Sequence, residues 1–150
     1  MHAMDIMRME SGFLHWGHDI SAEENQYEAG LKFTISYKKK IDFIGKQSLL
    51  KIKEKKNNKQ FAMLTLKDSK PGKPLMLHDE PIYLDGKIIG RTTSGNYSFN
   101  FNKNLAFGYL KIDEDINSLK NSAIEIEIEK KKYKAEILLK PLNQKNYKSS

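Results

Sequence analysis

Two histidines lie three residues apart in the segment His15-Trp16-Gly17-His18-Asp19. On a helix, this spacing would place both imidazoles on one face, and Asp19 could complete a metal site. Gly17 disfavours a continuous helix there, and the sequence offers no evident fourth ligand. We therefore predict structural roles for both histidines and no bound metal. Trp16 is either a packing anchor or part of a pocket wall, and its large ring favours core packing.

Glu10, two residues after Arg8, is a candidate ligand-binding carboxylate. A carboxylate can accept two parallel N–H hydrogen bonds from the edge of an aminopyrimidine ring. The alternative is a surface glutamate at the end of a short helix. From the residue type and position alone, the surface glutamate is the simpler interpretation.

A third group of polar residues occupies the segment from Gly90 to Ser98. We expect Thr93–Gly95 to follow a strand as a tight bend, where the hydroxyls bind either a ligand or only their own loop. Ser94 has no His–Asp partnership in the sequence, so we assign no nucleophile. Arg91 is either a partner for a carboxylate or an exposed strand charge, and the exposed charge is the plainer interpretation.

Composition limits the classes of function. The 150 residues carry a net charge of +7, but Arg8 and Arg91 are the only arginines among 26 basic residues. Recognition of phosphates and bases favours arginine, so we interpret the charge as general basicity and do not favour a nucleic-acid partner. The absence of cysteine excludes disulfides and thiolate chemistry. No apolar run could span a membrane and no signal peptide is evident, so we expect a cytoplasmic protein without a membrane partner.

The first region of the chain mixes helical and extended patterns. A short helix should stop at Gly12, and residues 21–24 form a capping-box pattern that could open a helical turn. Apolar and polar residues alternate over Leu31–Tyr37, which predicts a half-buried strand. Residues 46–55 indicate a helix with its leucines and isoleucine facing inward. The polar run 55–59 is the best domain boundary.

The second region is almost entirely β in character. Asp85-Gly86 between two apolar runs predicts a hairpin, because both central residues of a type I′ turn need positive φ. Further strands are expected over 61–66, around Phe107 and Tyr109, over 124–128 and over 133–139. Several short strands with regular turns favour a small antiparallel barrel or sandwich. The first region has one clear strand, which cannot satisfy its backbone alone, so we expect partner strands upstream or in another chain.

Several short motifs occur in order along the chain. They are Arg8-Met9-Glu10-Ser11-Gly12-Phe13, His15-Trp16-Gly17-His18-Asp19, Glu28-Ala29-Gly30-Leu31, Asp42-Phe43-Ile44-Gly45-Lys46, Thr93-Ser94-Gly95-Asn96-Tyr97-Ser98 and Ala106-Phe107-Gly108-Tyr109. Each is weakly specific, but the ordered series resembles the glycine cleavage T-protein (aminomethyltransferase) superfamily. The closer resemblance is to the folate-binding C-terminal regions of dimethylglycine and sarcosine dehydrogenases. It covers residues 3–142.

The resemblance implies a tetrahydrofolate cofactor and changes the interpretation of Glu10. This residue is similar to a pterin-binding carboxylate of the family, and we favour that role over a surface position. We take Glu10, Trp16, Arg91 and Ser94 as the candidate cofactor-binding residues. The resemblance implies no metal.

The resemblance also implies that part of the family's chemistry lies outside these residues. Family members place a catalytic aspartate far upstream, where it orients folate and the amine for methylene transfer. The matching sequence here starts a few residues before Arg8, so no residue aligns with that aspartate, and neither Asp5 nor Asp19 replaces it. We assign no catalytic residue. The flavin-binding domain of the dehydrogenase relatives is absent too, because there is no G-x-G-x-x-G fingerprint.

The predicted fold is α+β, with an incomplete α/β folate-binding piece over residues 1–58 and a small antiparallel β-barrel over residues 59–150. We expect the C-terminal portion of a folate-dependent one-carbon transfer protein that is inactive alone, with a partner chain supplying the missing N-terminal half. One alternative is a non-catalytic interaction or residual folate-binding module. Another is a basic nucleic-acid-binding barrel, which would need lysines and aromatics in one open groove. The feature that distinguishes folate binding from nucleic-acid binding is whether Glu10 and Thr93–Gly95 line one cleft or whether lysines and aromatics share an open groove.

Overall fold

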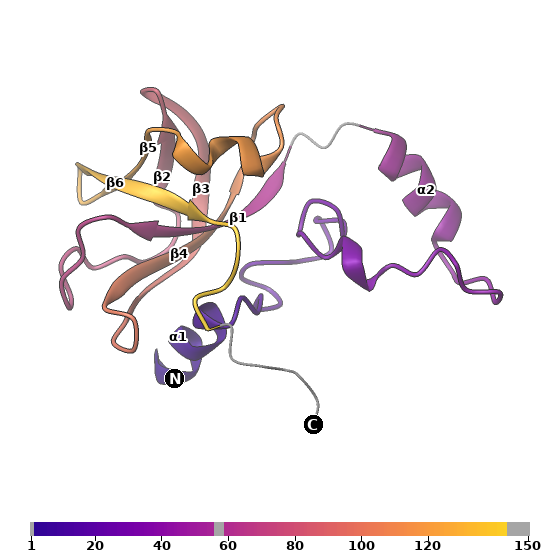
Figure 1. The fold of residues 1–150 in the computed structure, drawn as a ribbon, viewed down its shortest axis with the longest axis horizontal. Coiled ribbons are helices and arrows are strands. Elements are labelled where there is room, and N and C mark those ends of the chain that lie inside the picture. The colour runs from indigo at the N-terminus through magenta and orange to yellow at the C-terminus, as the bar shows by residue number, and fades with distance from the viewer. Residues whose placement is uncertain (1, 56–58, 144–150) are drawn as a thin grey trace.

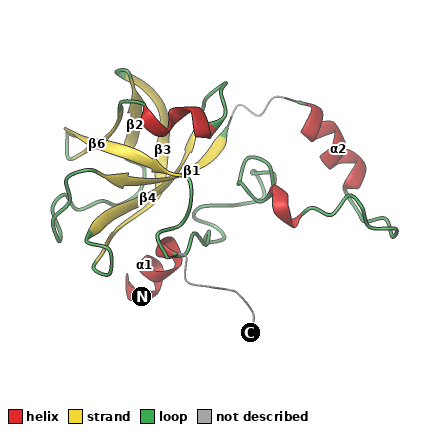
Figure 2. Cartoon of the chain, in the orientation of Figure 1, coloured by secondary structure: helices red, strands yellow, loops and turns green. Residues whose placement is uncertain are grey.

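The computed structural model describes residues 2–55 and 59–143 as a six-stranded antiparallel barrel with short helices around it (Figures 1 and 2). This confirms the α+β class and decides for a barrel over a sandwich. The strands are β1 (Gln60–Leu66), β2 (Pro81–Leu84), β3 (Lys87–Ser98), β4 (Lys103–Leu110), β5 (Ile124–Ile128) and β6 (Lys131–Leu138). They close in the order β1-β4-β3-β2-β5-β6. No described helix is long and apolar enough to cross a membrane.

Strand alternation fills the barrel. In β5, Ile124, Ile126 and Ile128 are buried, while the two glutamates between them are only half-buried. Gly90 allows β3 to approach β4 closely, because a Cβ there would lie 2.0 Å from the carbonyl oxygen of Tyr109. The interior of the barrel is one apolar cluster. Because such interiors are close-packed, the barrel is a rigid support for the loops around it.

Two tight turns fix the strand register. Asp85 and Gly86 have φ of 49° and 79° between β2 and β3, and Glu129 and Lys130 have φ of 51° and 62° between β5 and β6. Both pairs match the positive φ values that a type I′ turn requires. The predicted Asp-Gly hairpin and the pairing of the last two strands are therefore confirmed.

The N-terminal helix packs on the outside of the barrel. Helix α1 (His2–Glu10) ends before Gly12, whose φ is 76°, as the sequence predicts. Met9 is 2% exposed and joins Leu105 and Phe107 of β4 in a second, smaller core. This cluster joins the helix to the outer face of β4.

The predicted strand over Leu31–Tyr37 is wrong. The segment instead contains a short 3-10 helix, η1 (Lys32–Thr34), with the side chain of Phe33 80% exposed. Within the described residues, no neighbouring strand pairs with it. Its backbone is satisfied locally instead, as in the bond from Thr34 N to the carbonyl of Leu31 at 2.9 Å.

Helix α2 (Lys46–Glu54) is confirmed, but its predicted inward face is not a core. None of its residues is buried, and Figure 1 shows it at the end of an arm beside the barrel. Gly45 precedes it with φ of 88°. The remaining short helix, η2 (Ile116–Asn121), buries Leu119 in the barrel core.

Candidate functional site

Arg8 on α1 lies at the centre of a polar network between the helix and the barrel. Its Nη1 donates to Asp19 Oδ2 at 2.5 Å and to the carbonyl of Phe13 at 3.1 Å. Its Nε donates to Asp5 Oδ1 at 2.7 Å, and its Nη2 donates to Ser94 Oγ at 3.0 Å. The guanidinium is therefore occupied on every nitrogen by groups of this chain.

Asp19 is the buried acceptor of this network, with only 1% of its surface exposed. It accepts hydrogen bonds from Thr93 Oγ1 at 2.5 Å, from Ser94 Oγ at 2.8 Å and from the backbone N–H of His15 at 2.9 Å. An unpaired carboxylate would be costly at this depth, and Arg8 supplies the compensating charge. The metal-ligand role considered for Asp19 has no support, because its oxygens are committed to these donors.

A β-bulge brings the two hydroxyls to Asp19. The register between β3 and β4 shifts between Thr92 and Ser94, which leaves Thr93 as the extra residue. Consecutive side chains of a regular strand point to opposite faces, whereas here Thr93 and Ser94 both reach Asp19. The predicted tight bend at Thr93–Gly95 is therefore wrong, because these residues belong to β3.

Glu10 is buried, with 3% of its surface exposed, so the alternative that it is a surface glutamate is wrong. Its carboxylate accepts from Ser98 Oγ at 2.6 Å and from Asn100 Nδ2 at 3.0 Å. Ser98 is oriented in turn by accepting from the backbone N–H of Phe101 at 3.1 Å. The carboxylate is thus fixed against the turn between β3 and β4.

The other two candidate residues lie apart from Glu10. Trp16 is 68% exposed, which contradicts core packing. Arg91 is exposed on β3 and lines a cleft of about 500 Å³ together with Asp19 and Thr93. Glu10 is not among the residues that line this cleft, so the expectation that Glu10 and Thr93–Gly95 share one cleft is not met here. The roles of Glu10, Trp16, Arg91 and Ser94 in cofactor binding remain predictions.

The histidines of the first motif contact each other on the surface. The rings of His15 and His18 stack at 5.2 Å between centroids, and His78 meets His18 edge-on at 6.4 Å. No group of three or more metal-ligating side chains is arranged to hold an ion within residues 2–55 and 59–143. The stacking gives His15 and His18 a structural contact.

Sequence reasoning missed the partners of the two central charged groups. Ser98 and Asn100 follow Glu10 by 88 and 90 residues, and Asp19 meets hydroxyls 74 and 75 residues away. No local spacing rule connects such pairs. The one available signal was the occurrence of Asp19 and Ser94 within ordered motifs of one family.

Two family models match this chain. The "Glycine cleavage T-protein C-terminal barrel domain" matches residues 59–143, and the "GCVT N-terminal domain" matches residues 1–39. The first match covers the whole barrel. The second covers α1 and the loops that carry Asp19.

Curated relatives are similar over nearly all of this chain. Human mitochondrial dimethylglycine dehydrogenase is 37% identical over 143 residues, which are 94% of this chain and 16% of the relative. The aminomethyltransferase of Alkaliphilus metalliredigens is 33% identical over 146 residues, which are 97% of this chain and 38% of the relative. The chain therefore spans well under half the length of either relative.

A solved structure has the same fold. The aminomethyltransferase T of the glycine cleavage system from Bartonella henselae superposes with a TM-score of 0.77 at 22% identity. The match covers 93% of this chain and 38% of that one. At this identity the similarity shows the fold alone.

Replacing Ser94 by alanine should destabilise the chain. The hydroxyl both donates to Asp19 and accepts from Arg8, so its loss leaves one buried and one half-buried charged group short of a partner. We expect a loss of about 1–3 kcal/mol in the free energy of unfolding, measured by urea denaturation. Ser48→Ala, at an exposed position of α2, should change it by less than about 0.5 kcal/mol. Equal stabilities of the two variants would contradict this description of the network.

Proposed function

Because this chain belongs to the glycine cleavage T-protein family, we propose that it contributes folate contacts to tetrahydrofolate-dependent one-carbon transfer. The observation that carries the proposal is the position of Glu10. It is a buried carboxylate in the Arg8–Phe13 motif, held against the turn between β3 and β4. A buried carboxylate without a neighbouring cation is uncommon unless a ligand or a set of donors uses it.

The donor set around Glu10 fits an aminopyrimidine edge. A carboxylate offers about four acceptor positions, and here the donors to Glu10 are Ser98 and Asn100. Asn100 is exposed and can release the carboxylate, whereas Ser98 is buried and keeps it oriented. Glu10 would hold the pterin by two parallel hydrogen bonds, and tetrahydrofolate would supply the one-carbon acceptor.

We also propose that these 150 residues do not carry out transfer by themselves. The match to the N-terminal domain ends at residue 39, and the relatives are more than twice as long as this chain. Met4 and Met7, one turn apart on α1, are 77% and 60% exposed. They suit packing against the rest of a folate-binding domain, because flexible apolar side chains adapt well to a neighbouring surface.

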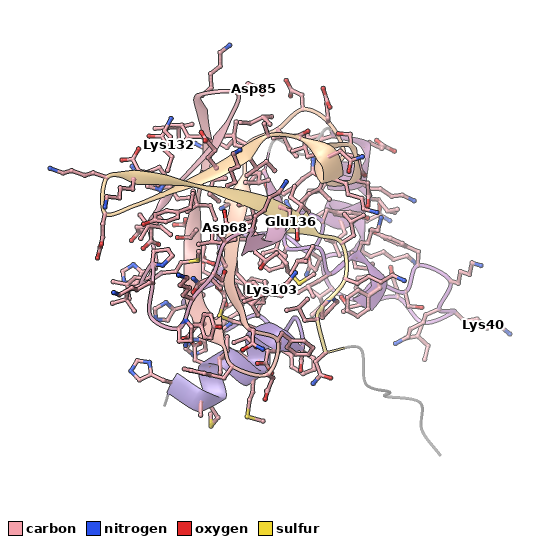
Figure 3. All side chains as sticks on the ribbon, turned by 60° about the vertical axis from the view of Figure 1, so that its left-hand side comes forward. Lys40, Asp68, Asp85, Lys103, Lys132 and Glu136 are labelled. Atoms are coloured by element: carbon pink, nitrogen blue, oxygen red, sulfur yellow. The ribbon has the colours of Figure 1, made fainter. Side chains whose placement is uncertain are left out.

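The barrel surface gives little support to nucleic-acid binding. Of the barrel aromatics that could stack on bases, Phe107 and Tyr109 are buried, and the exposed ones, Phe99 and Phe101, lie at the turn after β3. Basic and acidic side chains are interspersed, as with Lys103 and Glu136, whose charged atoms lie 3.7 Å apart (Figure 3). A single-stranded nucleic acid would need a continuous basic groove with open aromatic faces.

Glu10→Gln should weaken tetrahydrofolate binding while the fold is retained. Glutamine keeps one oxygen for Ser98 but replaces the second acceptor by a donor, which opposes the N–H groups of a pterin. We expect Kd to rise at least about tenfold by isothermal titration calorimetry. The matched control is Glu54→Gln, at an exposed position of α2, which should bind as the wild type does. Equal binding by the wild type and Glu10→Gln would contradict the pterin role.

The purified 150-residue chain should show no transfer activity. The family resemblance places no catalytic aspartate among the described residues. The expected rate of methylenetetrahydrofolate formation is therefore the rate measured in buffer without protein. A full-length aminomethyltransferase assayed in parallel provides the positive control. Robust turnover by the chain alone would overturn this part of the proposal.

A further inference from the structure

The cleft that contains Arg91 lies on the outer face of the barrel, where basic residues from β3 and from the ends of β1 and β4 surround one tyrosine. Arg91 of β3 is directly opposite Tyr109 of β4 in the register, so both side chains share one face. Lys111 is two residues beyond Tyr109 and continues that face. The Nζ of Lys59 lies 4.5 Å from the centroid of the Tyr109 ring. All four residues line the cleft of about 500 Å³.

Tyr109 brings an unused hydrogen-bonding group to this cleft. Its hydroxyl is buried and has no hydrogen-bond partner among the residues that the structure describes. Burial raises the pKa of this phenol above its ordinary value, and the nearby carboxylate of Glu24 raises it further. The hydroxyl therefore stays protonated at neutral pH and is available as a donor. A buried polar group without a partner costs free energy, which a ligand atom could recover.

Two of the three acidic residues of the cleft, Asp19 and Glu24, are paired with cations. Glu24 accepts from Lys59 Nζ at 2.5 Å. Burial alone would raise the pKa of Glu24, but hydrogen bonds from Lys59 and Ser21 outweigh it and hold that pKa below its usual value. Asp19 is paired with Arg8, and Asp79 lies 3.0 Å from the ring of His78.

The basic residues are not paired in the same way. Within residues 2–55 and 59–143, Arg91 and Lys111 have no ion-pair partner. The wall of the cleft thus has two cations without a compensating anion. Ile88 and Ile89 add apolar surface beside them.

We propose that this cleft binds the carboxylate end of a small organic acid, with Arg91 and Lys111 holding the charge and the Tyr109 hydroxyl donating a hydrogen bond. The planar guanidinium of Arg91 suits a carboxylate because it can donate two parallel bonds. Inorganic phosphate fits less well, because it has no apolar part to place against Ile88 and Ile89 beside the two cations. Two sources offer this chemistry: the glutamyl end of a folate and a free amino acid such as glutamate.

The site is separate from the pterin contact proposed for Glu10. Glu10 does not line the cleft, and its carboxylate is held by Ser98 and Asn100, which do not line the cleft either. A ligand that lacks a pterin therefore tests the cleft alone. The two proposals can fail independently.

The experiment is a calorimetric titration of the 150-residue chain with p-aminobenzoylglutamate, glutamate and inorganic phosphate. We expect saturable binding of p-aminobenzoylglutamate, of glutamate or of both. Arg91→Gln should raise Kd at least about tenfold, and Tyr109→Phe should raise it about threefold to tenfold. Tyr109→Phe should leave the free energy of unfolding unchanged or raise it, because its buried hydroxyl has no partner in the described residues. Lys87→Gln, an exposed position of β3 outside the cleft, is the control and should bind as the wild type does.

The relative affinities identify the source of the carboxylate. Tighter binding of p-aminobenzoylglutamate supports the folate end, and tighter binding of glutamate supports a free amino acid. Glu10→Gln should leave both affinities unchanged, which separates this result from a failure of the pterin contact. The proposal is overturned if neither carboxylate saturates, if Arg91→Gln and Tyr109→Phe bind as the wild type does, or if phosphate binds as tightly as the carboxylates.

Discussion

The buried ion pair between Arg8 and Asp19 is the constraint on which the rest of the structure depends. Removing two charges from water costs several kcal/mol per ion unless each finds its partner and its hydrogen bonds. Asp19 has no exposed side-chain surface and Arg8 has 17%, so Asp19 depends on Arg8 and on its neighbouring donors for compensation. The helix, the loop after it and the bulge of β3 must therefore keep one arrangement for both charges to be satisfied.

This constraint places the proposed ligand-binding carboxylate. Arg8 and Glu10 lie two residues apart on α1, and they contact Ser94 and Ser98, four residues apart on β3. Two anchors between the same pair of elements fix the direction of the helix as well as its position. Met9 lies between Arg8 and Glu10 in the sequence, and its apolar cluster with Leu105 and Phe107 packs α1 against β4. Glu10 is thus held by contacts that do not require the ligand, so its carboxylate is oriented in advance.

The barrel could be predicted from the sequence because its determinants are local. Alternation in Ile124–Ile128 and the Asp85-Gly86 turn each describe their own segment, and the structure agrees with both. The alternation in Leu31–Tyr37 is equally regular, but a strand also requires a neighbour, and that requirement is not visible in the segment itself. The large ring of Trp16 likewise favoured core packing, whereas the residue is 68% exposed in the structure. The partnership of Arg8, Asp19 and Ser94 depends on chain separations that no periodicity encodes, and only the ordered motifs indicated that these segments belong together.

A double-mutant cycle between Arg8→Gln and Asp19→Asn tests the central role of this ion pair most directly. The free energy of unfolding would be measured by urea denaturation for the wild type, both single variants and the double variant. If the two charges depend on each other as the structure indicates, the coupling energy should be about 2 kcal/mol, and the double variant should be less destabilised than the sum of the singles. A coupling energy near zero would show that the two side chains act independently, and would contradict the account.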